Sequence, residues 1–130
     1  MEEGTIHEEV RLFFDAFVSA FPTFKGENIA YLYAVPYMAI HSDGTAEVHA
    51  TYESIRGYFQ GVLNEYRQRG CIGCRYDELS VNEMGRNAVV GTVHWELTGQ
   101  RGDVLSSWRE SYHLVREEAR WKIRVSTDHA

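Results

Sequence analysis

Hydrophobic residues near the start of the chain recur at the spacing of an α-helix. They form one broad apolar stripe made of Ile6, Val10, Phe13, Phe14, Phe17, Val18 and Phe21. A stripe of this kind is typical of an amphipathic helix that packs its apolar face against a core. Thr5 is a suitable N-cap residue, and Pro22 lies where such a helix should end. The pattern therefore predicts a first helix that ends close to Phe21.

The next stretch of the chain changes from a helical to a strand-like pattern. Gly26 interrupts the chain, and residues 27–33 predict a short second helix that Pro36 would stop. Residues 37–49, "YMAIHSDGTAEVH", then predict two short strands. The turn between these strands falls at residues 42–44, where Ser, Asp and Gly favour a tight reversal of the chain.

A third helix is predicted after Thr51, which is a good N-cap residue. Its apolar face consists of Ile55, Tyr58, Phe59, Val62 and Tyr66. Gly70 is a natural residue to end this helix, because glycine adopts the left-handed conformation without strain. The helix should therefore occupy most of the segment between Thr51 and Gly70.

The rest of the chain has the pattern of four strands joined by polar turns. These strands cover residues 71–83, 87–98, 104–116 and 120–126. Helices grouped early and strands grouped late are typical of an α+β protein, in which an antiparallel sheet has helices on one face. At 130 residues, the chain is expected to form a single domain, residues 1–130, with a substantial core.

Charge and composition narrow the choice of partners and location. The net charge is −6 and no cluster of Lys or Arg stands out, which argues against nucleic acid as a partner. The acidic start "MEEGTIHEEV" lacks the apolar segment of a signal peptide, and no apolar run approaches transmembrane length. Two cysteines are too few for a disulfide framework, so we expect a cytoplasmic protein.

Several phrases of the chain resemble the SnoaL-like superfamily, the nuclear-transport-factor-like group of cone-shaped α+β proteins. They are the Phe-rich first helix, "ENIAYLYAVPYMAIHSDG", "TYESIRGYF" and "SYHLVREEARWKIRVSTDH". The resemblance implies a cystatin-like cone in which three N-terminal helices pack on a strongly curved antiparallel sheet. It also implies an apolar pocket at the wide end and pairing of subunits through the other face of the sheet. The superfamily includes ketosteroid isomerase, scytalone dehydratase, polyketide cyclases and binding domains, so the fold selects no single activity.

Strand 87–98 has two faces of different character. Val93, Trp95 and Leu97 share one face, and His94 lies on the other. The pattern alone assigns the apolar row to the core and His94 to solvent. The resemblance implies the reverse, with the apolar row buried between the subunits of a homodimer and His94 inside the cone. We expect this second arrangement.

Strand 104–116 carries Trp108, Glu110 and Tyr112 at alternate positions, so one face shows an indole, a carboxylate and a phenol. The resemblance places this face inward, with Glu110 as a partly buried acid near His94. A carboxylate and an imidazole in contact perturb each other's pKa. The alternative is a structural role, in which Glu110 forms an ion pair with an arginine or with His94 and Tyr112 belongs to the core.

His41 is the other candidate base. By the resemblance, it falls about where ketosteroid isomerase has its catalytic carboxylate, and an imidazole can act as a base near neutral pH. The alternative is an ordinary edge-strand residue near a turn. Steroid isomerisation itself is not expected, because the first helix offers Phe14 and Phe17 where the oxyanion hole of the isomerase would need a tyrosine.

The motif "CIGC" at residues 71–74 has the spacing of some metal and redox sites. Structural zinc would need about two further ligands at a recognisable spacing. A redox pair should open a helix, where the dipole lowers the thiol pKa, whereas this pair leads into a strand. Cys71 and Cys74 are therefore expected to be reduced thiols at the strand start, and no metal or cofactor is predicted.

Together these features predict a domain that binds an apolar or aromatic small molecule. The pocket walls would be Phe14, Phe17, Tyr37, Tyr58 and Trp108. His94, Glu110 and Tyr112 would supply polar groups. One alternative is a cofactor-independent isomerase, cyclase or dehydratase that uses His41 or His94 as base. The other is a non-catalytic module for dimerisation or protein interaction, with a filled and inert pocket.

Overall fold

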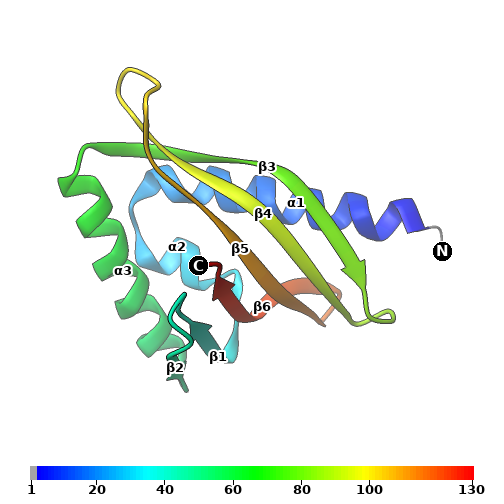
Figure 1. The fold of residues 1–130 in the computed structure, drawn as a ribbon. Coiled ribbons are helices and arrows are strands. Elements are labelled where there is room, and N and C mark those ends of the chain that lie inside the picture. The colour runs from blue at the N-terminus through cyan, green and yellow to red at the C-terminus, as the bar shows by residue number, and fades with distance from the viewer. Residues whose placement is uncertain (1–2) are drawn as a thin grey trace.

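A computed structural model describes residues 3–130, which form helices packed on one six-stranded sheet (Figure 1). The elements are α1 (Glu3–Ala20), η1 (Phe21–Thr23), α2 (Gly26–Ala30), β1 (Tyr33–Ile40), β2 (Ala46–His49), α3 (Tyr52–Gln68), β3 (Cys71–Glu83), β4 (Ala88–Gly99), β5 (Val104–Glu117) and β6 (Arg120–Asp128). Within the described residues, no helix is long and apolar enough to cross a membrane.

The sheet has the strand order β2-β1-β6-β5-β4-β3. Strands β3 to β6 form an antiparallel meander, and β1 joins it in parallel to β6, with β2 at the edge. The long strands β3, β4 and β5 curve across α1, while α2 and α3 lie toward the short strands (Figure 1). The predicted α+β class is therefore confirmed, and the antiparallel pairing holds for every pair of strands except β1 and β6.

The segment before β1 differs from its sequence prediction. The second helix, α2, ends at Ala30 rather than continuing to Tyr33, which instead begins β1. Pro36 lies inside this strand and not after a helix. The pairing of β1 with β6 shifts register between Tyr33 and Met38, so the strands form no regular hydrogen-bond ladder at this point. Proline is tolerated there, because its missing backbone N–H is not needed for the pairing. Thr5 also lies inside α1, so its predicted role as an N-cap is wrong.

Helix α3 begins as predicted. Thr51 precedes its first turn in an extended conformation, and its hydroxyl accepts a hydrogen bond from the backbone N–H of Ser54 at 3.1 Å. A side-chain oxygen at this position satisfies one of the helix donors that have no intrahelical acceptor.

Replacing Thr51 with alanine is expected to lower the free energy of unfolding by about 1 kcal/mol, because one N-terminal donor of α3 loses its acceptor. Urea denaturation followed by circular dichroism measures the loss. Thr51→Ser keeps the hydroxyl and is the matched control, with an expected change of a few tenths of a kcal/mol, on the order of experimental error. Equal losses in both variants would contradict the capping role.

The apolar stripe of α1 packs against β3, β4 and β5. Phe14 is fully buried, and its ring contacts Tyr76, Trp95 and Tyr112 at centroid distances of 5.8, 6.2 and 5.3 Å. The helix comes close to the sheet at Gly91, where an added Cβ would lie 3.1 Å from the Phe14 ring. A glycine at this point lets the aromatic ring sit directly on β4.

Strand β4 faces the helices with its apolar row, which overturns the expected orientation. Val93, Trp95 and Leu97 are 0, 3 and 4 % exposed within the single chain. The rings of Phe17 and Trp95 are 5.2 Å apart. These three side chains are already covered by helices of their own subunit, so the prediction that they form a dimer interface is wrong. The pattern taken alone, which assigned them to the core, is confirmed.

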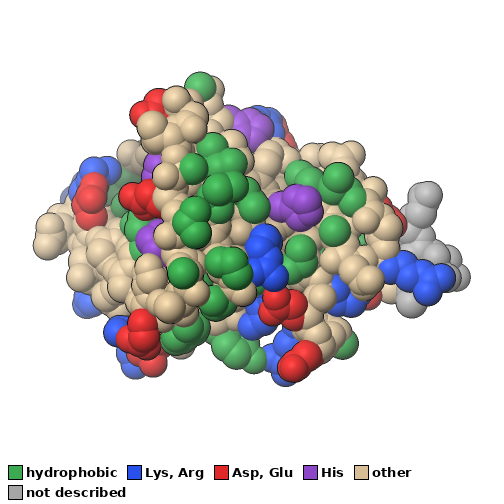
Figure 2. All heavy atoms as spheres, turned by 90° about the horizontal axis from the view of Figure 1, so that it is seen from below, with side chains coloured by type: hydrophobic (Ala, Val, Ile, Leu, Met, Phe, Trp, Pro, Cys, Tyr) green, Lys and Arg blue, Asp and Glu red, His purple; other side chains and the backbone are tan. Residues whose placement is uncertain are grey.

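Charged side chains on the surface are largely intermixed. On the face seen in Figure 2, the Lys and Arg side chains of the described residues lie among acidic ones rather than in one basic surface, and hydrophobic side chains gather near the centre. Basic and acidic side chains also form ion pairs on the surface, such as Arg56–Glu53 at 2.8 Å and Arg75–Glu96 at 2.6 Å. Exposed pairs of this kind contribute little to stability.

Candidate functional site

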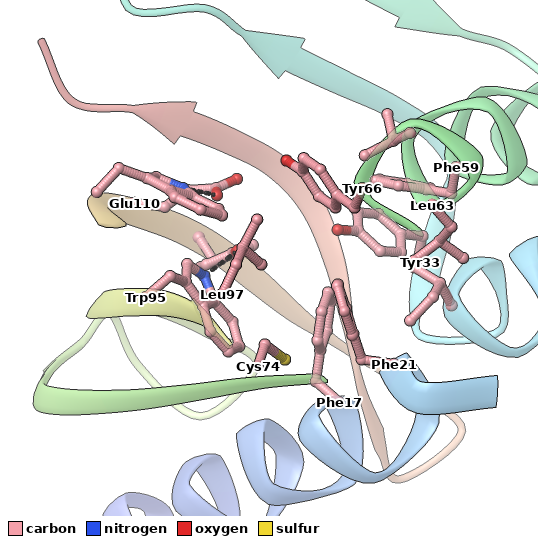
Figure 3. A pocket seen from close by; sticks show the side chains of 14 residues that line it. Phe17, Phe21, Tyr33, Phe59, Leu63, Tyr66, Cys74, Trp95, Leu97 and Glu110 are labelled. Atoms are coloured by element: carbon pink, nitrogen blue, oxygen red, sulfur yellow. Dashed lines mark hydrogen bonds between the residues drawn. The ribbon is translucent and has the colours of Figure 1, made fainter. Parts of the chain in front are cut away.

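A small cavity lies between the sheet and the helices (Figure 3). Its lining residues include Phe17, Phe21, Tyr33, Phe59, Leu63, Tyr66, Cys74, Trp95, Leu97, Trp108, Glu110 and Tyr112. The volume is about 80 Å³, whereas pockets for drug-sized ligands have roughly 300–1,000 Å³. Such a cavity suits a fragment about the size of one ring, rather than a steroid-sized molecule.

Glu110 places a carboxyl group against this apolar space. Its Oε1 accepts a hydrogen bond from the indole N–H of Trp108 at 2.9 Å (Figure 3). Burial, and after it the nearby carboxylate of Asp128, raise the pKa of Glu110 to about 8 against the opposing effect of hydrogen bonds from Trp108 and Tyr112. Glu110 is therefore mostly protonated and neutral at pH 7, when its O–H can donate a hydrogen bond.

The hydroxyl of Tyr112 is a second polar group beside the cavity. The indole N–H of Trp95 donates to the Tyr112 hydroxyl at 2.7 Å, which leaves the phenolic proton free to interact with Glu110. Burial and the neighbouring Glu110 keep the pKa of Tyr112 well above its usual value. The Tyr112 hydroxyl therefore keeps its proton and remains a hydrogen-bond donor. The indoles of Trp95 and Trp108 hold the Tyr112 hydroxyl and the Glu110 carboxyl group in place.

The cavity wall formed by the helices and β1 adds two further phenols. Tyr33 is 5 % exposed, and burial keeps its pKa well above the usual value. Burial likewise raises the pKa of Tyr66, to about 12. Sequence analysis missed Tyr33 because it was assigned to a helix. Aromatic and β-branched residues at every second position, Tyr33, Val35 and Tyr37, are the signal that could have indicated a strand there.

Four of the predicted site residues meet at the cavity. Phe17 and Trp108 belong to its walls, and Glu110 and Tyr112 supply polar groups. Trp95, which was assigned to the opposite face, also lines the cavity.

The other three predicted wall residues lie beside the cavity rather than on its lining. Phe14 is buried behind Tyr112. The Tyr37 hydroxyl is hydrogen-bonded to Ser126 at 2.6 Å, and the Tyr58 ring packs on His49 with centroids 4.7 Å apart. These positions assign Phe14, Tyr37 and Tyr58 to the shell that supports the cavity walls.

His94 does not meet Glu110, contrary to expectation. In the antiparallel pairing of β4 with β5, Glu110 lies opposite Val93, and His94 lies opposite Arg109 on the other face of the sheet. The imidazole Nδ1 of His94 contacts the Asp77 carboxylate at 2.8 Å. Side chains alternate between the faces of a strand, so one position of register separates His94 from Glu110 by the full thickness of the sheet.

Asp77, Glu78 and His94 form a group whose donor atoms lie within 4.8 Å of one another on the outer face of the sheet. Carboxylates and an imidazole at this separation could hold a divalent cation. The group is exposed and internally paired, because Asp77 contacts His94 and Glu78 forms an ion pair with Arg109. Its geometry is explained without an ion.

His41 lies at the turn between β1 and β2, outside the cavity. Its Nε2 is 3.8 Å from a carboxylate oxygen of Glu47, and about a third of its side chain is exposed. The structure therefore separates both predicted histidine bases from the half-buried carboxyl group of Glu110.

Cys71 and Cys74 are free thiols. The pairing of β3 with β4 shifts register between Cys71 and Gly73, which turns Ile72 outward and both thiols inward. Burial raises the pKa of Cys74, which lines the cavity, to about 12. Cys74 is therefore an un-ionised apolar wall group, and not a nucleophile.

Helices packed on a curved six-stranded sheet, with a small cavity between the two layers, are the architecture of NTF2-like proteins with a cystatin-like fold. The family model described as NTF2-like protein (DUF6841) matches residues 8–130, and the chain belongs to this family. The superfamily inferred from the sequence is thereby confirmed. No curated protein sequence matches the chain.

Solved structures with the same fold share little sequence with this chain. Aln2 from a Streptomyces species superposes with a TM-score of 0.79 at 16 % identity, covering 99 % of this chain and 93 % of that one. A putative calcium/calmodulin dependent protein kinase II association domain from Xanthomonas campestris gives 0.69 at 22 %, covering 94 and 85 %. An NTF2-like protein from Novosphingobium aromaticivorans gives 0.75 at 12 %, covering 95 and 80 %. These similarities show the fold and leave the activity open.

Proposed function

We propose that the chain is a small-molecule-binding domain whose ligand occupies the cavity and accepts a hydrogen bond from Glu110. The observation that carries this proposal is a carboxyl group that Trp108 holds against a space lined by aromatic rings, where burial raises its pKa. An apolar site with a few convergent polar groups is the usual form of a ligand pocket. Pocket size limits the ligand to a single ring or a short chain with one acceptor oxygen.

The acceptor preference follows from the protonation of Glu110. A neutral carboxyl group donates to a ketone or ester carbonyl without the cost of burying a net charge. A hydrocarbon of the same shape would leave that donor unpaired. Cyclopentanone should therefore bind more tightly than cyclopentane, by a factor of about 10, which corresponds to one buried hydrogen bond.

Binding can be measured by titrating cyclopentanone, cyclopentane and cyclopentylamine into isotope-labelled protein and following amide and indole N–H signals. Leu63→Phe should fill the cavity and weaken binding at least about tenfold. Leu12→Phe places the same ring on the exposed side of α1 and is the matched control. Unchanged binding in Leu63→Phe, or no shift of the Trp95 and Trp108 signals, would contradict the proposal.

A second candidate function rests on the two adjacent carboxyl groups. Glu110 and Asp128 are opposite each other in the pairing of β5 with β6, and their interaction raises the pKa of Glu110. Two carboxyl groups that share a proton can act as acid and base, so proton transfer at carbon next to a carbonyl is possible without a cofactor. In this candidate Asp128 replaces His41 and His94 as the base.

Proton transfer can be tested with the same ligand. The protein should accelerate the exchange of the α-protons of cyclopentanone for deuterium in D₂O, and Asp128→Asn should abolish the acceleration. Exchange that equals the buffer rate would exclude this candidate for cyclopentanone and leave the binding proposal intact.

A further inference from the structure

A second group of interacting side chains lies outside the cavity, where β2 meets α3. His49 is the last residue of β2, and its Nδ1 is 2.7 Å from the hydroxyl of Ser54 in the first turn of α3. The other ring nitrogen, Nε2, is 3.6 Å from a carboxylate oxygen of Glu47. We propose that Ser54, His49 and Glu47 form an acyl-transfer site in which Ser54 attacks small carboxylic or thiocarboxylic esters.

The proposed site requires different roles of the two ring nitrogens. The Ser54 hydroxyl must donate to Nδ1, and the neutral imidazole then carries its hydrogen on Nε2, which faces Glu47. Nε2 is buried and makes no hydrogen bond within residues 3–130, so the nearby carboxylate is the group that can stabilise the ring when it gains a second proton. A hydroxyl bonded to a base, with a third group orienting that base, is the arrangement of an activated nucleophile.

Two aromatic rings hold the imidazole of His49 in place. The Tyr37 ring lies nearly parallel to it, at 13° and 5.9 Å between centroids, and the Tyr58 ring is 4.7 Å away. The His49 side chain is only 12 % exposed as a result. Its Nδ1 is therefore directed at Ser54 by packing as well as by the hydrogen bond, which favours catalysis because the base needs no reorientation.

The start of α3 supplies the remaining requirement, donors for a developing oxyanion. The backbone N–H of Ser54 is bonded to Thr51, whereas the N–H groups of Tyr52 and Glu53 belong to the first turn and have no intrahelical acceptor. Such donors stabilise negative charge at a helix N-terminus. Ser54 is exposed, so an ester can reach its hydroxyl.

The chemistry balances without a cofactor. Ser54 Oγ bonds to the carbonyl carbon while its proton moves to Nδ1 of His49. The bond to the leaving oxygen or sulfur then breaks, and His49 returns the proton to the departing alcohol or thiol. Water attacks the acyl-serine, again giving its proton to Nδ1, and the carboxylic acid leaves as Ser54 recovers its hydrogen. Glu47 touches no reacting atom and is a positioning residue.

A fluorophosphonate probe tests the nucleophile directly, because it bonds to activated hydroxyls much faster than to ordinary ones. The full-length protein is incubated with the probe, and the labelled peptide is identified by mass spectrometry. We expect label on Ser54, none in Ser54→Ala, and a labelling rate at least about 100-fold lower in His49→Gln, which keeps a hydrogen-bonding side chain but no base. Glu47→Gln should slow labelling about tenfold while leaving the concentration for half-maximal rate unchanged, since it acts through His49.

The chain contains its own control. Ser111 contacts Nε2 of His129 at 2.7 Å and also the Thr92 hydroxyl, so it is a serine–histidine pair without the Glu47 carboxylate. Ser111→Ala should label as fast as the parent protein, and so should the cavity-filling Leu63→Phe, which keeps this test separate from the binding proposal. Thermal melts establish that each variant is folded.

Three results would overturn the inference: no label on Ser54, label on Ser111 instead, or equal rates in the parent protein and folded His49→Gln. Each would mean that the contact between His49 and Ser54 only ties β2 to α3.

Discussion

Replacing Phe14 with alanine is expected to lower the free energy of unfolding by about 3–5 kcal/mol, the range for removing a fully buried aromatic side chain. Phe14 is 0 % exposed and contacts Tyr76, Trp95 and Tyr112. The space left behind cannot close easily, because one side of it is the backbone of β4 at Gly91. Urea denaturation followed by tryptophan fluorescence and by circular dichroism measures the loss.

The control for Phe14→Ala comes from the same helix. Leu12 is 56 % exposed, so Leu12→Ala removes apolar atoms from α1 without opening a cavity, and we expect a change within about 0.5 kcal/mol. A loss below about 1 kcal/mol for Phe14→Ala would mean that neighbouring rings refill the site, and that α1 is held to the sheet more loosely than its contacts indicate.

Stability is expected to fall as pH rises through the range between the two pKa values of Glu110. In the unfolded chain this carboxyl group has its ordinary pKa, 4.5, and in the folded protein burial raises its pKa to about 8. Between these values the unfolded state releases the proton while the folded state keeps it. The unfolded state then binds fewer protons, so raising the pH favours unfolding, and the effect levels off above about pH 8.

Glu110→Gln should remove this pH dependence, because the amide does not ionise. The free energies of unfolding of the variant and the parent protein should differ least near pH 4. Between pH 4 and about pH 8, the variant should become more stable relative to the parent, by on the order of a few kcal/mol. Denaturation curves at several pH values measure the difference. Asp128→Asn should reduce the pH dependence of stability, since it removes the negative charge that helps to raise the pKa of Glu110.

Glu83→Gln is the matched control, because Glu83 is exposed in β3 and removing its charge should leave the pH profile parallel to that of the parent. A constant difference between Glu110→Gln and the parent protein across this pH range would contradict a protonated Glu110 in the folded protein. The proposed hydrogen bond to a ligand carbonyl would then lose its donor.

Local periodicity determined most of the elements. The stripe from Ile6 to Phe21 requires a helix, because only the 3.6-residue period brings those side chains to one face. The N-cap role of Thr51 and the two faces of β4 could also be predicted from the sequence, because a helix cap and a strand face depend on neighbours within a few residues. The inward row of Trp108, Glu110 and Tyr112 followed from the same alternation once the fold was inferred by resemblance.

Only the tertiary structure decided which face of β4 meets the helices and which groups meet across strands. The inward placement of Trp95 depends on α1 covering that face, and the proximity of Glu110 to Asp128 depends on the register of β5 with β6. A shift of one residue in the pairing of β5 with β6 would separate Glu110 from Asp128 while leaving the sequence pattern unchanged. The meeting of His49, Glu47 and Ser54 depends instead on the short connection by which β2 turns into α3. Helices and strands follow from local spacing, whereas the cavity and its polar groups arise from the packing of segments that are distant in sequence.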